Sequence, residues 1–206
     1  MTKRLDRKLA TIRAGAYTPT DFIIADAKDG DMAFGCAAPG IGANGRLTDQ
    51  GVFAESGVTP AVRLNDTTDI WRGRGASYAE RPARPFRSAV LERVKPVADL
   101  GLYAVTFYND LEQDIRTLEE YARFRDEASA AGVRHFLEVF NPAMAVDTTT
   151  GDFASYNNDM IARILAGVSR LDRPIFLKAV YNGPAATEEI AGYDPENLVF
   201  GILGGG

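Results

Sequence analysis

The second half of the chain alternates between two hydrophobic periods. Runs rich in β-branched and aromatic residues, each ending in polar residues or glycine, are typical of strands and occupy residues 101–110, 133–142, 173–184 and 197–206. The segments between them place apolar side chains at helical spacing and occupy residues 111–132, 157–171 and 185–193. Strands that alternate with helices predict βαβ units, and therefore a parallel sheet covered by helices.

Individual residues support the helix predictions. Ile115, Leu118 and Ala122 form an apolar stripe in the first of these helices, and Gly132 is its stop signal. Pro184 leads into the third helix. The second helix carries a longer apolar stripe, made of Met160, Ile161, Ile164, Leu165 and Val168.

The first half of the chain is less regular. Residues 20–30 predict an early strand, and residues 88–101 predict the helix that precedes the strand at 101. Residues 31–87 are rich in glycine, proline and arginine, which predicts long loops around short elements, with one further strand expected within residues 59–75. The basic N-terminal segment, residues 1–15, predicts a surface helix.

Two architectures fit this order of elements. An open α/β sheet would be complete at 206 residues, whereas a (β/α)8 barrel typically needs about 250 residues. We favour the barrel, with its last βα units absent from the sequence, because the predicted strand ends coincide with polar residues as in barrel active sites. The prediction is a single barrel domain over residues 1–206, with residues 31–87 as a loop-rich insertion.

Composition narrows the function classes. A formal net charge of −5 leaves no basic stripe to neutralise phosphates, which argues against nucleic-acid binding. No apolar run approaches the roughly 20 residues of a membrane span. A single cysteine, Cys36, excludes an intrachain disulfide and fits a reducing compartment, so we expect a cytoplasmic protein. With one histidine and one cysteine we expect neither a zinc site nor another cofactor, although a magnesium site of carboxylates stays open.

Charged side chains recur on one face of three predicted strands. Side chains two residues apart share a face of a strand, so Asp26 and Lys28 lie together on the first strand. Glu138 shares a face with large apolar residues in “HFLEVF”, and Lys178 does so in “FLKAVY”. If these faces line a barrel, the four charges converge at the mouth formed by the carboxyl ends of the strands. Charges in such a setting must be paired or must have strongly shifted pKa values.

A desolvated amine close to another cation is a nucleophile that can form a Schiff base with a carbonyl substrate. Lys178 is the candidate for this amine, and Lys28 for the neighbouring charge. Glu138 would exchange protons as general acid and base, and Asp26 would orient the nucleophile or a substrate hydroxyl. The plainer alternatives are a Lys178 that only reaches to water and a Glu138 that is only its ion-pair partner. For Asp26 and Lys28, the alternative is a salt-bridged turn.

Four stretches, in this order, resemble the class I, Schiff-base aldolase family: “FIIADAKDG”, “VTFYND…LEEYARFRDEASAAGVRHFLEVF”, “PIFLKAVYNG” and “LVFGILGGG”. The nearest branch is that of tagatose-bisphosphate and related sugar-phosphate aldolases, and the resemblance covers residues 20–30 and 100–206. It implies that Lys178 forms the Schiff base, with Glu138 as general acid/base and Asp26 as a first-strand carboxylate.

The same resemblance implies a phosphate site and shows one departure. Gly204, Gly205 and Gly206 would begin a phosphate-binding loop, where backbone N–H groups can approach an anion. Where that branch often has a lysine, this sequence has Thr106. Lys28 is a candidate for the replacement cation.

A polar segment in the first half offers further candidates. Asn65, Asp66 and Asp69 could bind a polyol. Arg72 and Arg74 could clamp a phosphate or a carboxylate. The alternative is an Asx-type turn followed by a solvated basic loop.

Two single residues complete the set. Tyr108 shares a face with Thr106 and could donate a hydroxyl hydrogen bond to substrate, although a packing role is the simpler interpretation. His135 is out of register with the face of Glu138, so we expect it to pack towards the helices.

Together these features predict a metal-independent class I aldolase-like lyase that cleaves or forms a phosphorylated, sugar-like carbonyl compound. We also expect a homo-oligomer. Two alternatives stay open. One is another barrel lyase or isomerase acting on an acidic metabolite, and the other is a catalytically silent barrel that binds a sugar phosphate or a partner protein.

Overall fold

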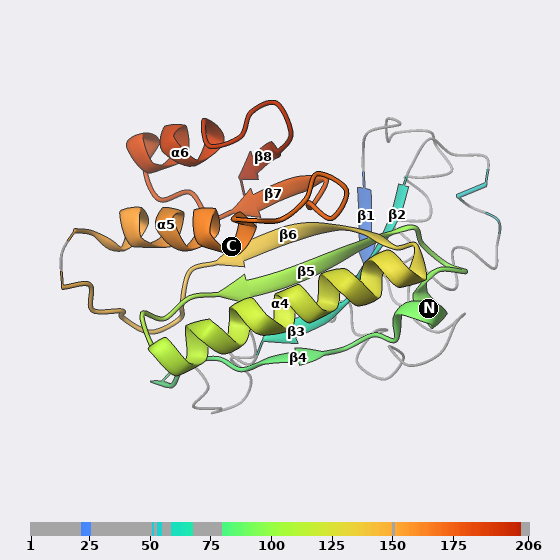
Figure 1. Cartoon of the computed structure of the whole chain (residues 1–206), viewed down its shortest axis with the longest axis horizontal. Helices are drawn as coiled ribbons and strands as arrows, with labels where there is room; N and C mark the ends of the chain where they lie inside the picture. The colour runs from blue at the N-terminus through green and yellow to red at the C-terminus, as the bar shows by residue number, and fades with distance from the viewer. Residues whose placement is uncertain are drawn as a thin grey trace, which may run out of the picture. The chain divides into compact units, whose positions relative to one another are not determined.

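The computed structural model describes residues 22–25, 51, 53–54, 59–67, 80–149 and 151–202, with the first of these segments described by its backbone alone. From residue 85 onwards, strands and helices alternate along the chain (Figure 1). The elements in chain order are β1 (Phe22–Ala25), β2 (Thr59–Arg63), β3 (Asn65–Thr67), β4 (Pro85–Arg87), α3 (Leu91–Val94), β5 (Leu100–Thr106), α4 (Leu111–Ala131), β6 (Arg134–Phe140), α5 (Phe153–Leu165), β7 (Phe176–Ala179), α6 (Pro184–Ala191) and β8 (Val199–Ile202).

Parallel pairing dominates the strands. The main sheet has the strand order β1-β2-β5-β6-β7-β8, and β3 pairs with β4 in a separate two-stranded sheet. The pairs β1–β2, β2–β5, β6–β7 and β7–β8 are parallel. The predicted α/β class, with helices between parallel strands, is therefore confirmed. The strand expected within residues 20–30 is β1, and the one expected within residues 59–75 is present as β2 and β3.

The chain divides into two compact units, and the first contains β1, β2, α3 and the start of β5. Its pairing of β2 with β5 continues just past β2, where Leu64 N–H donates to the Leu102 carbonyl at 2.8 Å. The helix predicted over residues 88–101 is wrong in length, because α3 spans only Leu91–Val94. Pro96 explains the early end, since proline has no N–H to continue the helical hydrogen bonds.

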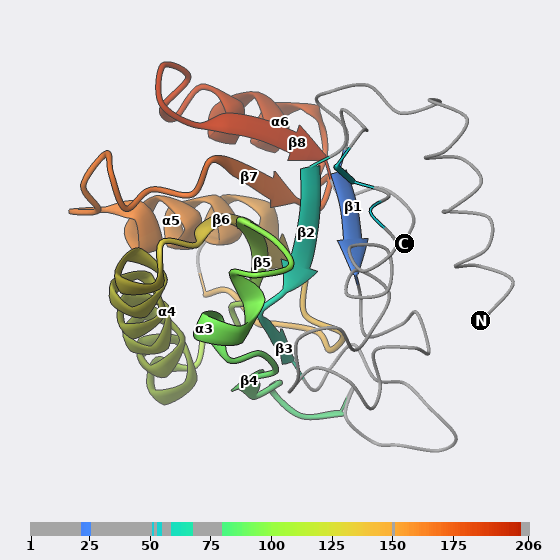
Figure 2. The same ribbon diagram turned by 90° about the vertical axis from the view of Figure 1, so that its right-hand side faces the viewer.

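The second unit contains the rest of β5 and the elements α4, β6, α5, β7, α6 and β8 (Figure 2). An aromatic cluster packs α4 against β5 and β6. Tyr103 of β5 stacks on Phe124 of α4 with ring centroids 4.2 Å apart. His135 of β6 meets the same phenylalanine edge-on at 5.1 Å. One face of these two strands is therefore covered by α4.

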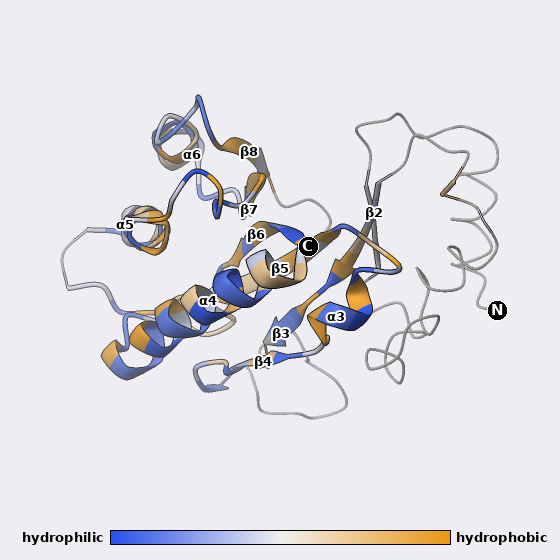
Figure 3. Ribbon diagram, turned by 45° about the vertical axis from the view of Figure 1, so that its right-hand side comes forward, coloured by the Kyte–Doolittle hydropathy of each residue, from blue (hydrophilic) through white to orange (hydrophobic). Residues whose placement is uncertain are grey.

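The buried stripe of α4 differs from the predicted one. It consists of Asp114, Thr117, Tyr121, Phe124 and Ala128, which repeat at helical spacing. Ile115, part of the predicted stripe, is instead exposed. Figure 3 shows the mixture of apolar and polar residues along this helix. Two polar residues can occupy the buried stripe because each has a hydrogen-bond partner. Asp114 accepts from the Tyr156 hydroxyl, and the Thr117 hydroxyl donates to the Gln113 carbonyl.

Both ends of α5 lie earlier than predicted. Asp152 caps its first turn by accepting a hydrogen bond of 2.8 Å from Ser155 N–H, so the helix begins at Phe153. The predicted apolar stripe is largely confirmed, with Ile161, Ile164 and Leu165 buried.

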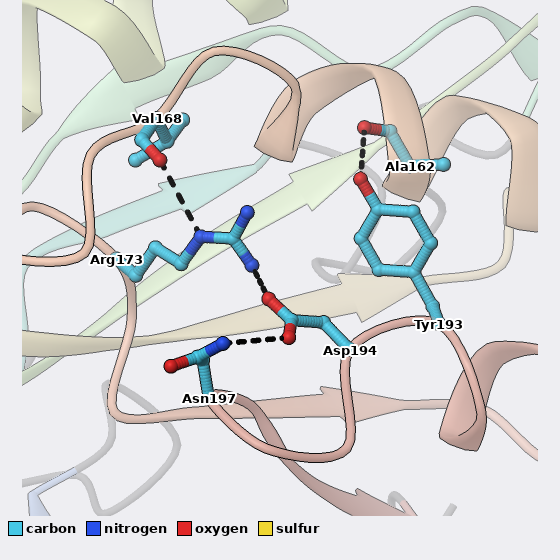
Figure 4. Close-up of polar contacts among 6 residues, drawn as sticks. All are labelled: Ala162, Val168, Arg173, Tyr193, Asp194 and Asn197. Atoms are coloured by element: carbon cyan, nitrogen blue, oxygen red, sulfur yellow. Dashed lines mark hydrogen bonds and ion pairs between the residues drawn. The ribbon is translucent and has the colours of Figure 1, made fainter.

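Polar contacts also join the turns that enter β7 and β8 (Figure 4). Arg173 forms an ion pair with Asp194, and the Tyr193 hydroxyl donates to the Ala162 carbonyl of α5 at 3.2 Å. The Asp194 carboxylate also accepts from the Asn197 amide. These contacts lie before the amino ends of β7 and β8. The residues described in the next section lie on the strands and at their carboxyl ends.

Candidate active site

Glu138 and Lys178 are directly opposite each other in the parallel register of β6 and β7. Because neighbours in register point to the same face of a sheet, their side chains meet. Lys178 Nζ donates to Glu138 Oε1 at 2.6 Å, a charge-assisted hydrogen bond. The predicted proximity of this amine and this carboxylate is confirmed, whereas their catalytic roles stay a prediction.

The two side chains differ in exposure. Glu138 is 2% exposed, while the Lys178 side chain is 24% exposed. The amine is thus reached from solvent, and the carboxylate lies behind it. An ion pair that is partly removed from water gains Coulomb energy but loses hydration.

An aromatic pair lies one step below the ion pair on the same face. Phe136 and Phe176 precede Glu138 and Lys178 by two residues on their strands, and they stack with ring centroids 4.3 Å apart and planes at 13°. This apolar floor occupies the two positions next to the ion pair on the same face of the strands.

His135 points to the other face of β6, as predicted. Its Nε2 and the Tyr121 hydroxyl of α4 are hydrogen bonded at 2.8 Å. Burial lowers the pKa of His135 from 6.5 to about 4, with a smaller effect from the Arg125 guanidinium. His135 is therefore a neutral, buried residue of the helix-covered face, and it takes no part in the candidate site.

Thr106 and Tyr108 are both buried at the carboxyl end of β5. The Tyr108 backbone N–H donates to Asp114 Oδ1 at 2.9 Å. The Thr106 hydroxyl is buried and has no hydrogen-bond partner among the residues that the structure describes. The buried position of Tyr108 agrees with a packing role, and a contact of its hydroxyl with substrate stays a prediction.

Several predicted site residues lie outside the described residues. They are Asp26, Lys28, Asp69, Arg72, Arg74, Gly204, Gly205 and Gly206. Asn65 and Asp66 are described, and both are buried in β3. The strand at these two residues takes the place of the Asx-type turn considered for them, whereas the basic loop expected after it lies outside the described residues.

Sequence reasoning missed an amide pair at the carboxyl ends of β6 and β7. Asn141 Nδ2 donates to Asn182 Oδ1 at 2.6 Å, and Asn182 Nδ2 donates to Asn141 Oδ1 at 3.2 Å. The pair joins the loops that follow Glu138 and Lys178. An asparagine shortly after each of two neighbouring strands was the available signal, but the pairing depends on the strand register.

A pocket at the start of α4 was also missed. It has a volume of about 440 Å³ and is lined by Arg81, Pro82, Arg84, Asp110 and Gln113. Asp110 caps α4 by accepting from Gln113 N–H at 2.9 Å. The spacing of Asp110 and Gln113 resembles a capping box and was the signal for this helix start. The lining includes neither Glu138 nor Lys178.

Within the described ranges, no group of three or more histidine, cysteine, aspartate or glutamate side chains could hold a metal ion. No helix in the same part of the chain has the length and apolar character required to cross a membrane. No protein-family model matches the chain, and no curated protein matches it in sequence. Membership of the aldolase family is therefore a proposal.

Proposed function

We propose that the chain is a class I aldolase-like lyase that holds its substrate as a Schiff base on Lys178. The observation that carries the proposal is the 2.6 Å contact between Lys178 Nζ and the buried Glu138 carboxylate. It joins a nucleophile and a proton carrier on adjacent strands, above an apolar floor. The closed (β/α)8 barrel, the phosphorylated sugar-like substrate, the cytoplasmic location and the homo-oligomer belong to the same proposal.

The first stage is formation of the iminium. Transfer of one proton from the Lys178 ammonium to Glu138 gives a neutral amine and a carboxylic acid. The amine lone pair attacks the substrate carbonyl carbon, and an amine proton moves to the carbonyl oxygen, which gives a carbinolamine. Glu138 then donates its proton to the carbinolamine hydroxyl, which leaves as water. The products are a protonated imine on Lys178 and an ionised Glu138.

The second stage is cleavage of the carbon–carbon bond. Glu138 accepts the proton of the substrate's β-hydroxyl, an aldehyde leaves, and the bonding electrons pass to the iminium to give an enamine. Glu138 returns the proton to the enamine carbon, and water hydrolyses the restored iminium to release the ketone and the Lys178 ammonium. One proton carrier therefore serves every step, and condensation is the same sequence in reverse.

The environment of the pair suits this chemistry. The Phe136–Phe176 stack gives the pair an apolar neighbour on the same face of the sheet. Partial exposure of Lys178 leaves the nitrogen accessible to a substrate. Among the described residues, the charged neighbour of the amine is the Glu138 carboxylate, and the role expected of Lys28 stays a prediction because that residue lies outside the described ranges.

Borohydride trapping tests the proposal. The full chain is incubated with dihydroxyacetone phosphate and sodium borohydride, and the modified residue is located by peptide mass spectrometry. We expect a mass gain on Lys178 that disappears in Lys178→Ala. Lys95→Arg is the matched control, since Lys95 is a partly exposed lysine paired with Asp99, and its trapping should equal that of the wild type.

The alternative is a silent barrel that binds a sugar phosphate or a partner protein. It is favoured if a panel of ketose and aldose phosphates produces no mass gain on Lys178. Retention of phosphate-dependent thermal stabilisation in that case would identify binding without covalent chemistry.

A further inference from the structure

Thr106 ends β5 with a buried polar atom that has no partner within the described part of the chain. The residue is 4% exposed, and its Oγ1 has no hydrogen-bond partner among the described residues. A buried hydroxyl without a partner costs stability, and native proteins retain few of them. Valine has the same shape and would remove this cost, so a hydroxyl at this position points to a partner other than the described residues.

The register of β5 and β6 places this hydroxyl relative to the ion pair. Arg134 N–H donates to the Asp99 carbonyl at 2.9 Å, which sets Leu100 opposite Arg134 at the start of both strands. β5 and β6 are each seven residues long. Thr106 therefore lies opposite Phe140, at their shared carboxyl end.

The same register puts Thr106 on the face of Glu138 and Lys178. Glu138 is two residues before Phe140 on β6, so it points the same way as Thr106. The hydroxyl is about one pleat repeat, roughly 7 Å, nearer the carboxyl end than the ion pair. His135 and Tyr103, at odd positions of the two strands, pack on α4 and confirm that the even positions form the opposite face. A small molecule attached to Lys178 would lie between the ion pair and the Thr106 hydroxyl.

We propose that Thr106 binds a hydroxyl group on the carbon next to the substrate carbonyl. The inference rests on the proposed Schiff-base function and adds a specificity-determining residue to it. A threonine hydroxyl can donate one hydrogen bond and can also accept. An alcohol group of the substrate has the same two capacities, so the two can bond each other. The threonine hydroxyl carries no charge, and a neutral hydroxyl on a carbon atom can both donate to it and accept from it. Substrates of the site are hydroxy-ketones or hydroxy-aldehydes.

Two matched ketones test this role by reductive trapping on the full chain. Dihydroxyacetone and acetone share the carbonyl and the three-carbon skeleton and differ only in the hydroxyls. We expect Thr106→Val to reduce the rate of trapping dihydroxyacetone on Lys178 by about 10- to 100-fold and to leave the acetone rate unchanged. Thr106→Ser keeps a hydroxyl at this position. Its ratio of the dihydroxyacetone to the acetone trapping rate should be at least a tenth of the wild-type ratio.

The melting temperature distinguishes this role from a purely structural one. If the Thr106 hydroxyl only stabilised the fold, Thr106→Val would melt at a lower temperature than the wild type. Thr106→Val should melt at the same temperature as the wild type or higher, because it removes a buried hydroxyl without a described partner. An unchanged ratio of the two trapping rates in Thr106→Val overturns the assignment of Thr106 alone. Failure of the wild type to trap either ketone on Lys178 instead overturns the Schiff-base function, and the assignment of Thr106 with it.

Discussion

Asn141 and Asn182 exchange two hydrogen bonds between their side-chain amides, across the loops that follow β6 and β7. Each amide thereby satisfies the other without using charge. Since both are half-buried, the bonds are partly protected from competition by water. The pair fixes the carboxyl ends of the two strands that carry Glu138 and Lys178.

The first prediction is that this amide pair acts as a unit. Asn182→Ala should lower the free energy of unfolding by about 1–2 kcal/mol, because it leaves the Asn141 amide without its partner. Asn141→Ala should have a similar effect, and the double variant should cost little more than either single change. Urea unfolding of the three variants measures this coupling. Strict additivity of the two single changes would show that the reciprocal bonds contribute nothing.

The second prediction concerns the asymmetry of the ion pair. Lys178→Met removes the ammonium that is paired with the buried Glu138 carboxylate, and we expect a loss of about 3–5 kcal/mol in the free energy of unfolding. Glu138→Gln should cost only about 1–2 kcal/mol, since the partly exposed ammonium can recover hydration. The double variant, which buries two neutral groups, should recover part of the Lys178→Met loss. Chemical unfolding compares the three, and an equal loss in both single variants would contradict the assigned burial.

In the candidate site, the face to which each side chain points could be predicted from the sequence, but the pairing of the strands could not. Strand periodicity alone was enough to predict that Glu138 and Lys178 point to one side of the sheet and His135 to the other. The register was not predictable, because sliding β7 by two residues keeps every side chain on its face. Only the observed register sets the amine opposite the carboxylate, with the Phe136–Phe176 stack beneath them.

The predicted buried face of α4 was wrong for a related reason. A periodic apolar pattern defined α4, but its buried stripe includes Asp114 and excludes Ile115. Asp114 is buried because the Tyr156 hydroxyl and the Tyr108 N–H both reach it. These partners come from α5 and from the loop after β5. Local propensity carries no information about such distant partners, and the tertiary contact decides which face is buried.

The third prediction is a pH dependence of stability that originates at His135. Burial holds its pKa at about 4 in the folded chain, against 6.5 in the unfolded chain, with Arg125 acting in the same direction and Asp172 in the opposite one. Between these values the unfolded state binds a proton that the folded state does not, so stability falls as the pH falls. The contribution is fully present above pH 6.5 and is lost progressively down to about pH 4.

The expected loss between pH 7.5 and pH 5 is about 2 kcal/mol for this single group. Urea unfolding at several pH values measures it. His135→Gln cannot titrate and keeps an amide that can bond the Tyr121 hydroxyl, so its stability should vary less with pH by about that amount. Parallel pH profiles for the wild type and His135→Gln would assign the acid sensitivity to other groups.

The fourth prediction uses the close approach of Leu64 to Gly101 in the first unit. A Cβ atom on Gly101 would lie 2.1 Å from Leu64 Cδ1 and 2.4 Å from Leu64 Cγ, far inside contact distance. Leu64 is buried, and its backbone N–H is bonded to the Leu102 carbonyl, so the leucine has little room to yield. Gly101→Ala should therefore lower the free energy of unfolding by about 2–3 kcal/mol.

The sign of this effect should reverse when the leucine is removed. Leu64→Ala alone should cost about 2–5 kcal/mol, because it opens a cavity against β5. In that background the added methyl of Gly101→Ala fills part of the cavity and also lowers the entropy of the unfolded chain. Gly101→Ala should then be neutral or stabilising, which thermal or urea unfolding of the four variants can establish. If the substitution destabilises both backgrounds equally, the restriction at Gly101 comes from the backbone rather than from Leu64.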